Sequence, residues 1–159
     1  MHFASATNED GTHPSGVRCD YLFSRLYRGE GVFHTSVDAG TYAPRDSFSL
    51  YEHAFYLFAL AWLQADGASR YPVAATARSC LEWLCAHFAK RNGGFEDSLP
   101  PCQSLKSNPH MHLLEAALAW IDVSDASSRQ PWVDSPFFTL EAGVADYVGG
   151  YLAHTDSYR

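Results

Sequence analysis

An internal repeat of two apolar, helix-length segments constrains the fold of this chain most strongly. Residues 51–62 and 109–120 align at a spacing of 58 residues, and both end in Ala-Leu-Ala-Trp. A Gly-x-Phe sequence precedes each copy, as Gly31-Val32-Phe33 and as Gly93-Gly94-Phe95. The repeating unit is therefore a loop plus a helix hairpin rather than a single helix. Helix hairpins of this length stack into solenoids or close into toroids.

Apolar periodicity along the chain predicts helices and no convincing strands. The first predicted helix is strongly apolar, begins after a cap at Asp46 or Ser47 and ends before Gly67. The second is amphipathic, and a late helix has a low propensity because it contains three glycines. The predicted helices cover residues 47–64, 72–90, 109–121 and 136–153, with the tail of another at 21–26. The predicted fold class is all-α.

The polarity of these helices predicts two layers. A helix that is apolar on every side needs neighbours all round, so the first and third helices form the inner layer of a closed ring. The amphipathic helix belongs to the outer layer. Both inner helices carry polar residues near their N-terminal ends, namely Tyr51, His53, Asn108 and His112. These residues would share one rim of the ring, and that rim is the candidate pocket.

The start of the third helix concentrates polar groups in an otherwise apolar segment. His112 and Glu115 are three residues apart and therefore share one helix face. Spacing alone favours a buried hydrogen-bond network over a catalytic pair. A metal site is the least favoured alternative and we expect none, because His110 and His112 point to nearly opposite faces of the helix.

Charge and cysteine usage exclude several classes of protein. The net charge of -7 and the scattering of the 11 basic residues argue against a nucleic-acid partner. The 4 cysteines form no Cys-x-x-Cys pair, which predicts free thiols rather than disulfides or a zinc site. The longest apolar run, residues 54–63, is too short to cross a bilayer, and no leader pattern opens the chain. We therefore expect no membrane partner and a cytoplasmic location.

Two motifs in the inner helices resemble those of a known enzyme family. Residues 108–116 read Asn-Pro-His-Met-His-Leu-Leu-Glu-Ala, and residues 50–61 read Leu-Tyr-x-His-Ala-Phe-x-Leu-x-Ala-Leu-Ala. Together with the Gly-x-Phe loops, these motifs resemble the N-acylglucosamine 2-epimerase superfamily, which includes mannose isomerases and cellobiose epimerases. The resemblance covers residues 21–123.

The resemblance implies a fold and a domain organisation. The implied fold is a partial (α/α)6 barrel, a toroid of helix hairpins of which about two and a half are present. Residues 1–159 then form a single partial-barrel domain. It would consist of an irregular N-terminal segment at 1–20, the family-like core at 21–123 and a divergent tail at 124–159.

The resemblance also implies cofactor-independent epimerisation or isomerisation of a sugar. A proton next to the carbonyl carbon of the open-chain sugar is removed and returned through an enediol-like intermediate. His112 is the implied catalytic residue, and its side chain suits the role because imidazole exchanges protons near neutral pH. We assign sugar binding to Asn108, Tyr51, Glu115 and His53. His53 faces a different side of its helix from Tyr51, which favours a core or lid contact over a role as base.

The chain departs from the family pattern after Trp120. The family's usual acid and base, a His-x-x-Glu-Trp helix and a histidine near the C-terminus, have no counterpart there, and no motif surrounds His154. A full ring of such hairpins, at roughly 60 residues each, needs more than twice this length. We therefore interpret the chain as a truncated family member, and its activity as an isolated chain stays open.

Two alternative functions also stay open. One is a non-catalytic helical fragment or sugar-binding module, and the other is an (α/α)6 glycoside hydrolase using Glu96 and Asp97. Adjacent loop residues diverge, which favours a solvated pair over a hydrolytic site. The expected ligand is a small sugar in each case. An open arc would leave the inner faces around Phe55, Phe58 and Trp62 uncovered, which predicts self-association.

Overall fold

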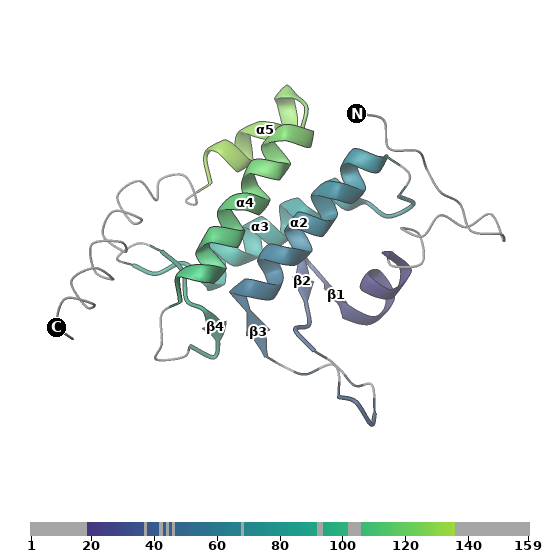
Figure 1. The fold of residues 1–159 in the computed structure, drawn as a ribbon, viewed down its shortest axis with the longest axis vertical. Helices are drawn as coiled ribbons and strands as arrows, with labels where there is room; N and C mark the ends of the chain where they lie inside the picture. Colours follow the sequence, from purple (N-terminus) through teal and green to yellow (C-terminus); the bar gives the residue numbers. More distant parts are fainter. Residues whose placement is uncertain are drawn as a thin grey trace.

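A computed structural model describes residues 19–135, except for 37, 42, 44, 46, 68, 92, 93 and 102–105. The predicted helix at 136–153, Cys102 and the predicted irregular segment up to residue 18 lie outside the described residues. The helices are η1 (Leu22–Leu26, a π-helical turn), α2 (Leu50–Asp66), α3 (Val73–His87), α4 (Ser107–Val123) and α5 (Ala126–Val133) (Figure 1). The predicted all-α class is confirmed.

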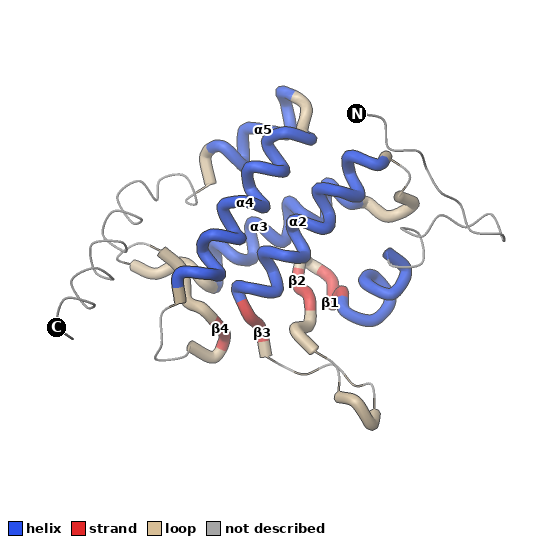
Figure 2. The backbone as a smooth tube through the Cα atoms, viewed as in Figure 1, coloured by secondary structure: helices blue, strands red, loops and turns tan. Residues whose placement is uncertain are grey.

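Two short antiparallel ribbons accompany the helices (Figure 2). Strand β1 (Tyr27–Gly29) pairs with β2 (Val32–Phe33), and β3 (Phe48–Ser49) pairs with β4 (Ser98–Leu99). The sequence analysis missed all of them, because two or three residues are too few to display the alternation that identifies a strand.

Helices α2 and α4 lie side by side and begin at the same end of the molecule (Figure 1). The β3 and β4 ribbon lies at that end, so both helices begin beside the ribbon. Helix α3 packs against α2, and α5 packs against α4. Each repeat therefore contributes one helix to the central pair and one helix that covers it.

The observed helix ends differ from the predicted ends by a few residues. Helix α2 begins at Leu50 rather than at residue 47, because the Ser49 hydroxyl caps it by accepting the Glu52 N–H at 3.5 Å. It ends, as predicted, at Gly67, whose φ of 66° is left-handed. Helix α4 begins at Ser107 rather than at residue 109, and its N-cap residue, Lys106, makes no capping bond with its own side chain.

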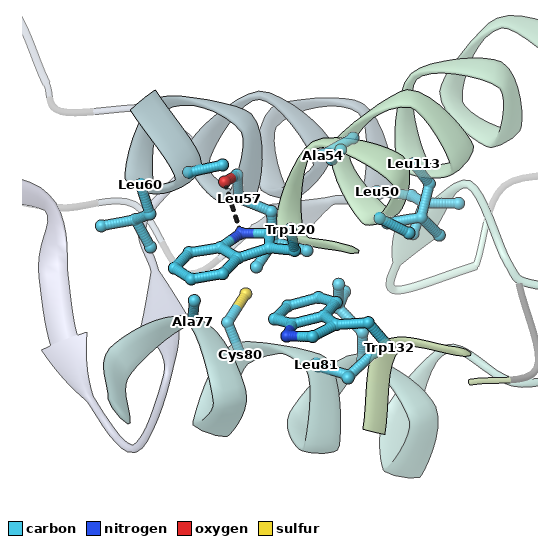
Figure 3. Packing of buried hydrophobic residues seen from close by; sticks show 14 of the residues in the cluster. Leu50, Ala54, Leu57, Leu60, Ala77, Cys80, Leu81, Leu113, Trp120 and Trp132 are labelled. Carbon is cyan, nitrogen blue, oxygen red and sulfur yellow. Dashed lines mark hydrogen bonds between the residues drawn. The ribbon is translucent and has the colours of Figure 1, made fainter. Parts of the chain in front are cut away.

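The core lies between α2, α3 and α4 and extends to α5 (Figure 3). The Trp120 indole N–H donates to the Leu57 carbonyl at 2.8 Å, which joins α4 to α2 inside the apolar core. Trp132 stacks on Trp120 with ring centroids 5.1 Å apart and an interplanar angle of 9°. Residues 126–133, which we assigned to a divergent tail, therefore form a helix that completes the core. Its N-terminal signal is Asp125, whose carboxylate accepts the backbone N–H groups of Ser127 and Ser128.

His53 fastens the first Gly-x-Phe loop to α2. Its Nε2 accepts the backbone N–H of Phe33 at 3.4 Å, so the neutral ring carries its proton on Nδ1. The Nδ1–H donates to the Ser49 carbonyl, one turn earlier in the chain, at 2.8 Å. Both ring nitrogens are thus bonded to backbone, and the side chain is fully buried.

His110 repeats this arrangement on α4. Its Nε2 accepts the Phe95 N–H at 3.4 Å, and its Nδ1 bonds to the Lys106 carbonyl at 3.0 Å. The two histidines are 57 residues apart, since 110 − 53 = 57, whereas the Ala-Leu-Ala-Trp sequences align at 58. The structural repeat, defined by the two histidines that bond to the loops, is therefore 57 residues long. It is one residue shorter than the spacing of the matching apolar sequences.

Acid should weaken the fold through His53. Burial lowers the pKa of His53 from 6.5 to about 4, because the interior disfavours the charged ring. The unfolded chain therefore binds a proton at His53 near pH 6.5, whereas the folded chain binds it only near pH 4. The contribution of neutral His53 to the free energy of unfolding is complete above pH 6.5 and is lost as the pH falls towards 4. Between pH 6.5 and 4, the difference in free energy of unfolding between wild type and His53→Gln should fall by about 3 kcal/mol, as measured by urea unfolding. The exposed His87 supplies the control, and a His87→Gln variant that shows the same narrowing would contradict this role for His53.

Gly31 should be intolerant of any side chain. A Cβ at this position would overlap the backbone of Ser79 and Cys80 in α3, and its φ of 79° is already left-handed. Gly29 has a φ of 103° but open space around it, so it provides a matched control. We expect Gly31→Ala to lower the free energy of unfolding by about 3 kcal/mol or more, and Gly29→Ala by about 1–2 kcal/mol from backbone strain alone. Equal losses in chemical denaturation would rule out the close approach to α3.

The expected self-association stays a prediction, and an exposed apolar face supports it. Trp62 is 64% exposed, and a groove of about 200 Å³ between α2 and α4 is lined mainly by Phe58, Ala61, Trp62, Ala119 and Val123. If a second copy covers this face, Trp62→Gln should raise the dimer dissociation constant by about tenfold or more in analytical ultracentrifugation. Gln64→Ser, at an exposed site on the same helix, should leave it unchanged. A wild-type chain that stays monomeric at every concentration would overturn the prediction.

Candidate functional site

A cavity of about 490 Å³ opens at the shared N-terminal end of α2 and α4. Ser49 of β3 and Ser98 of β4 are among the residues that line it. Most of the residues that line it have polar side chains, and they include Tyr51, Glu52, Asp97, Ser98, Lys106 and Asn108. A volume of this size is typical of small-molecule sites.

Two of the predicted site residues line this cavity. Tyr51 lies in the first turn of α2, and Asn108 lies in the first turn of α4. Because α2 and α4 are adjacent, the two side chains approach the cavity from neighbouring helices. The repeat therefore brings together residues that are 57 positions apart in the sequence.

His112 and Glu115 form a bonded pair about one turn after Asn108 on α4, and neither is among the residues that line the cavity. The Nδ1 of His112 lies 2.8 Å from the Glu115 carboxylate, one helical turn away. The His112 ring packs edge-on against Tyr51, with centroids 5.4 Å apart, and lies 4.7 Å from the Phe55 ring. Since the carboxylate accepts the Nδ1–H, the lone pair of the neutral ring is on Nε2. This pair can accept a proton at one defined nitrogen.

His53 does not belong to this group. Its side chain is fully buried, and backbone groups occupy both of its ring nitrogens. The assignment of His53 to sugar binding therefore needs correction, because the residue has no free atom to offer a ligand. Its position instead matches the core contact that the helix-face argument favoured.

Asp97 is the cavity residue whose role the sequence analysis missed. Its backbone carbonyl accepts the Leu50 N–H at 3.0 Å, and its Oδ2 accepts the Lys106 N–H at 2.6 Å. Asp97 is only 6% exposed, so the expectation of a solvated pair with Glu96 is wrong for this residue. Glu96 does diverge from it, as expected, and pairs with Lys90 at 3.7 Å. The available sequence signal was the second Gly-x-Phe loop, two residues before Asp97.

Two carboxylate oxygens at this site lack hydrogen-bond partners. Asp97 Oδ1 and Glu52 Oε2 are both buried and unbonded, and both residues line the cavity. Within the described part of the chain, no group of three or more histidine, cysteine, aspartate or glutamate side chains is placed to hold a metal ion.

The described cysteines offer no reactive thiol. Cys19, Cys80 and Cys85 are unpaired, in keeping with the prediction of free thiols. Burial raises the pKa of each of these thiols, so they stay protonated at neutral pH.

None of the described helices is long and apolar enough to cross a membrane.

Comparison with known proteins identifies relatives of this chain. The family model for N-acylglucosamine 2-epimerase (GlcNAc 2-epimerase) matches residues 20–140, which extends past the predicted core limit of residue 123. A mannose-6-phosphate isomerase from Rhizobium meliloti (strain 1021) is 37% identical over 117 residues, which cover 70% of this chain and 29% of that protein.

A solved structure supports the same relationship at the level of the fold. Cellobiose 2-epimerase from Spirochaeta thermophila DSM 6192 matches with a TM-score of 0.60 and 20% sequence identity, over 77% of this chain and 34% of that chain. The chain thus spans about a third of the length of the relatives that it matches. The chain belongs to the N-acylglucosamine 2-epimerase family and folds as part of an (α/α)6 barrel.

Proposed function

We propose that this chain carries part of the active site of a sugar epimerase or isomerase. The names of the two relatives, a mannose-6-phosphate isomerase and a cellobiose 2-epimerase, both describe rearrangement within a sugar. The observation that carries the proposal is the bonded His112 and Glu115 pair, packed against a tyrosine that lines a polar cavity.

The proposed reaction begins with proton abstraction at the carbon next to the carbonyl of the open-chain sugar. The Nε2 of His112 takes that proton, and the electron pair of the C–H bond moves into an enediol-like intermediate. Return of the proton to the opposite face of the same carbon gives the epimer. Return to the former carbonyl carbon, with a proton shift between the oxygens, gives the isomer. The reaction is neutral in protons and electrons and needs no cofactor.

Glu115 would position the imidazole and stabilise its protonated form. A carboxylate bonded to Nδ1–H keeps the ring in one tautomer and offsets the positive charge that appears when Nε2 takes a proton. Tyr51 and Asn108 would bind the sugar from the two inner helices. His53 would act only through the loop that it holds.

The chain spans about a third of the length of its relatives, which matters for whether it carries every residue that the complete reaction needs. We propose a single partial-barrel domain, in which the family's later histidines would be supplied from outside this chain or be absent. In the second case the chain would bind a sugar without turning it over, which is the main alternative.

Deuterium exchange tests the proposed chemistry. Incubation of the chain with mannose, N-acetylmannosamine or cellobiose in heavy water should place deuterium on the carbon next to the carbonyl, as followed by NMR. His112→Ala should reduce this exchange by at least about a hundredfold, since a positioned base contributes that much. Glu115→Gln should reduce it by about tenfold to a hundredfold, since the base loses its orienting partner.

An exposed histidine outside the site serves as the control. His87→Ala, at the end of α3, should exchange at the wild-type rate. Exchange that survives in His112→Ala would remove His112 from the catalytic role. Saturable sugar binding without exchange in the wild-type chain would favour the binding module, and release of free sugar from an aryl glycoside would favour a hydrolase.

A further inference from the structure

His110 closes a ring of hydrogen bonds between the second Gly-x-Phe loop and the first turn of α4. Its Nε2 accepts the Phe95 N–H at 3.4 Å, so the neutral ring carries its proton on Nδ1 and donates it to the Lys106 carbonyl at 3.0 Å. The Lys106 N–H in turn donates to Oδ2 of Asp97, two residues beyond Phe95, at 2.6 Å. The loop and the start of the helix are therefore joined at two points.

The same loop is bonded on its other side to the chain just beyond α3. The Glu96 N–H donates to the Phe88 carbonyl at 2.8 Å, and the Lys90 N–H donates to the Gly94 carbonyl at 2.9 Å. The Gly94 backbone also passes close to the His110 ring, since a Cβ at Gly94 would lie 4.0 Å from Nε2. The loop is thus attached to the end of α3 without any help from α4, and His110 adds an attachment to α4.

The two parts that His110 joins form two walls of the cavity. The loop wall consists of Asp97 and Ser98, and the helix wall consists of Lys106 and Asn108 at the start of α4. His110 is not among the lining residues and lies about 6 Å further along the helix axis than Lys106. A single bond between two segments leaves them free to rotate about it, whereas a second bond at a distance restricts the rotation. The bond from His110 to the loop therefore bears on the relative orientation of the two walls.

We propose that His110 is a positioning residue of the candidate site, which sets the orientation of the loop wall relative to the helix wall. It touches neither the sugar nor the reacting atoms. The proposal rests on the proposed function for the statement that these walls bind a sugar. The bonded His112 and Glu115 pair lies within α4 alone, so it keeps its geometry when the loop moves. Loss of the His110 bond to the loop therefore weakens sugar binding and spares the chemical step.

Two amide substitutions separate the bonds of His110. His110→Gln places an amide oxygen near the position of Nε2, where it accepts the Phe95 N–H, and gives up the bond to the Lys106 carbonyl. His110→Asn places an amide N–H near the position of Nδ1, keeps the bond to Lys106 and is too short to reach Phe95. His110→Ala removes both bonds. If the bond to the loop is the one that matters, His110→Gln should behave like wild type and His110→Asn like His110→Ala.

Amide hydrogen exchange tests the proposal without a sugar. Followed by NMR, exchange of the Phe95 and Lys106 N–H groups should be about tenfold faster or more in His110→Asn, and within about threefold of wild type in His110→Gln. The N–H of Leu57, a fully buried residue of α2, should keep its wild-type rate, which separates a loosened loop from a loosened fold. Unchanged exchange at Lys106 in both His110→Asn and His110→Ala would overturn the proposal.

Sugar kinetics separate positioning from folding. In the deuterium incorporation assay, His110→Asn should raise KM for the sugar by about tenfold and leave kcat within about threefold, and His110→Gln should restore KM. A variant that merely leaves part of the sample unfolded would instead lower kcat at unchanged KM. His87→Asn is the matched control, because Nδ1 of His87 makes the same kind of bond, to the Trp83 carbonyl at 2.9 Å, at the end of α3. It should change neither constant.

The outcomes distinguish this proposal from the proposed function. If wild type incorporates no deuterium into any sugar, and amide exchange still separates His110→Asn from His110→Gln, the positioning role stands while the proposed function fails. If wild type incorporates deuterium with the same KM in all three His110 variants, the proposed function stands and the positioning role fails. A lower kcat at unchanged KM in His110→Asn would also overturn the positioning role, since it would assign His110 to folding alone.

Discussion

The arrangement of the site depends on one residue that bonds to the beginnings of two helices. Helix N-termini leave backbone N–H groups without partners inside the helix. Asp97 satisfies two of them, one on Leu50 at the start of α2 and one on Lys106 immediately before α4. The starts of α2 and α4 are therefore both bonded to Asp97, which also lines the cavity at their shared end. The core packing at the other end, around Trp120 and Leu57, fixes how the helices continue.

The helices and their repeat were predictable because their signals are local. Gly67 ends α2 and Pro72 precedes α3, and apolar residues fill the intervening segments. The register of the repeat was not predictable from matching letters. Trp62 and Trp120 align in sequence, yet Trp62 is 64% exposed and Trp120 is 2% exposed, because the two tryptophans are not equivalent when the histidines are matched at 57 residues. Equivalent positions in the two helices are those related by the contacts of His53 and His110 with the loops. Matching the identical apolar residues does not reveal these positions.

The candidate site likewise has one part that could be predicted from the sequence and one part that could not. The pairing of His112 with Glu115 follows from helical spacing alone, and the structure contains it. The position of Asp97 depends on its bonds to Leu50 and Lys106, which are 47 and 9 residues away in the sequence. A carboxylate in a loop shows no periodicity that would indicate such contacts. The two short ribbons were missed for a related reason, since their strands are defined by pairing across the chain and not by their own sequence.

The distribution of donors and acceptors orients a bound sugar. Proton removal next to a carbonyl builds negative charge on the carbonyl oxygen, and that oxygen needs a donor nearby. Asn108 lies four residues before His112 on the same helix face and lines the cavity, so its amide would supply that donor. Asp97 and Glu52 would repel the same charge. If the reaction proceeds as proposed, the reacting end of the sugar therefore faces Asn108 and His112. The remaining hydroxyls then extend towards Asp97 and Glu52, the acidic residues that line the cavity, so the sugar would span the distance from the base to the cavity.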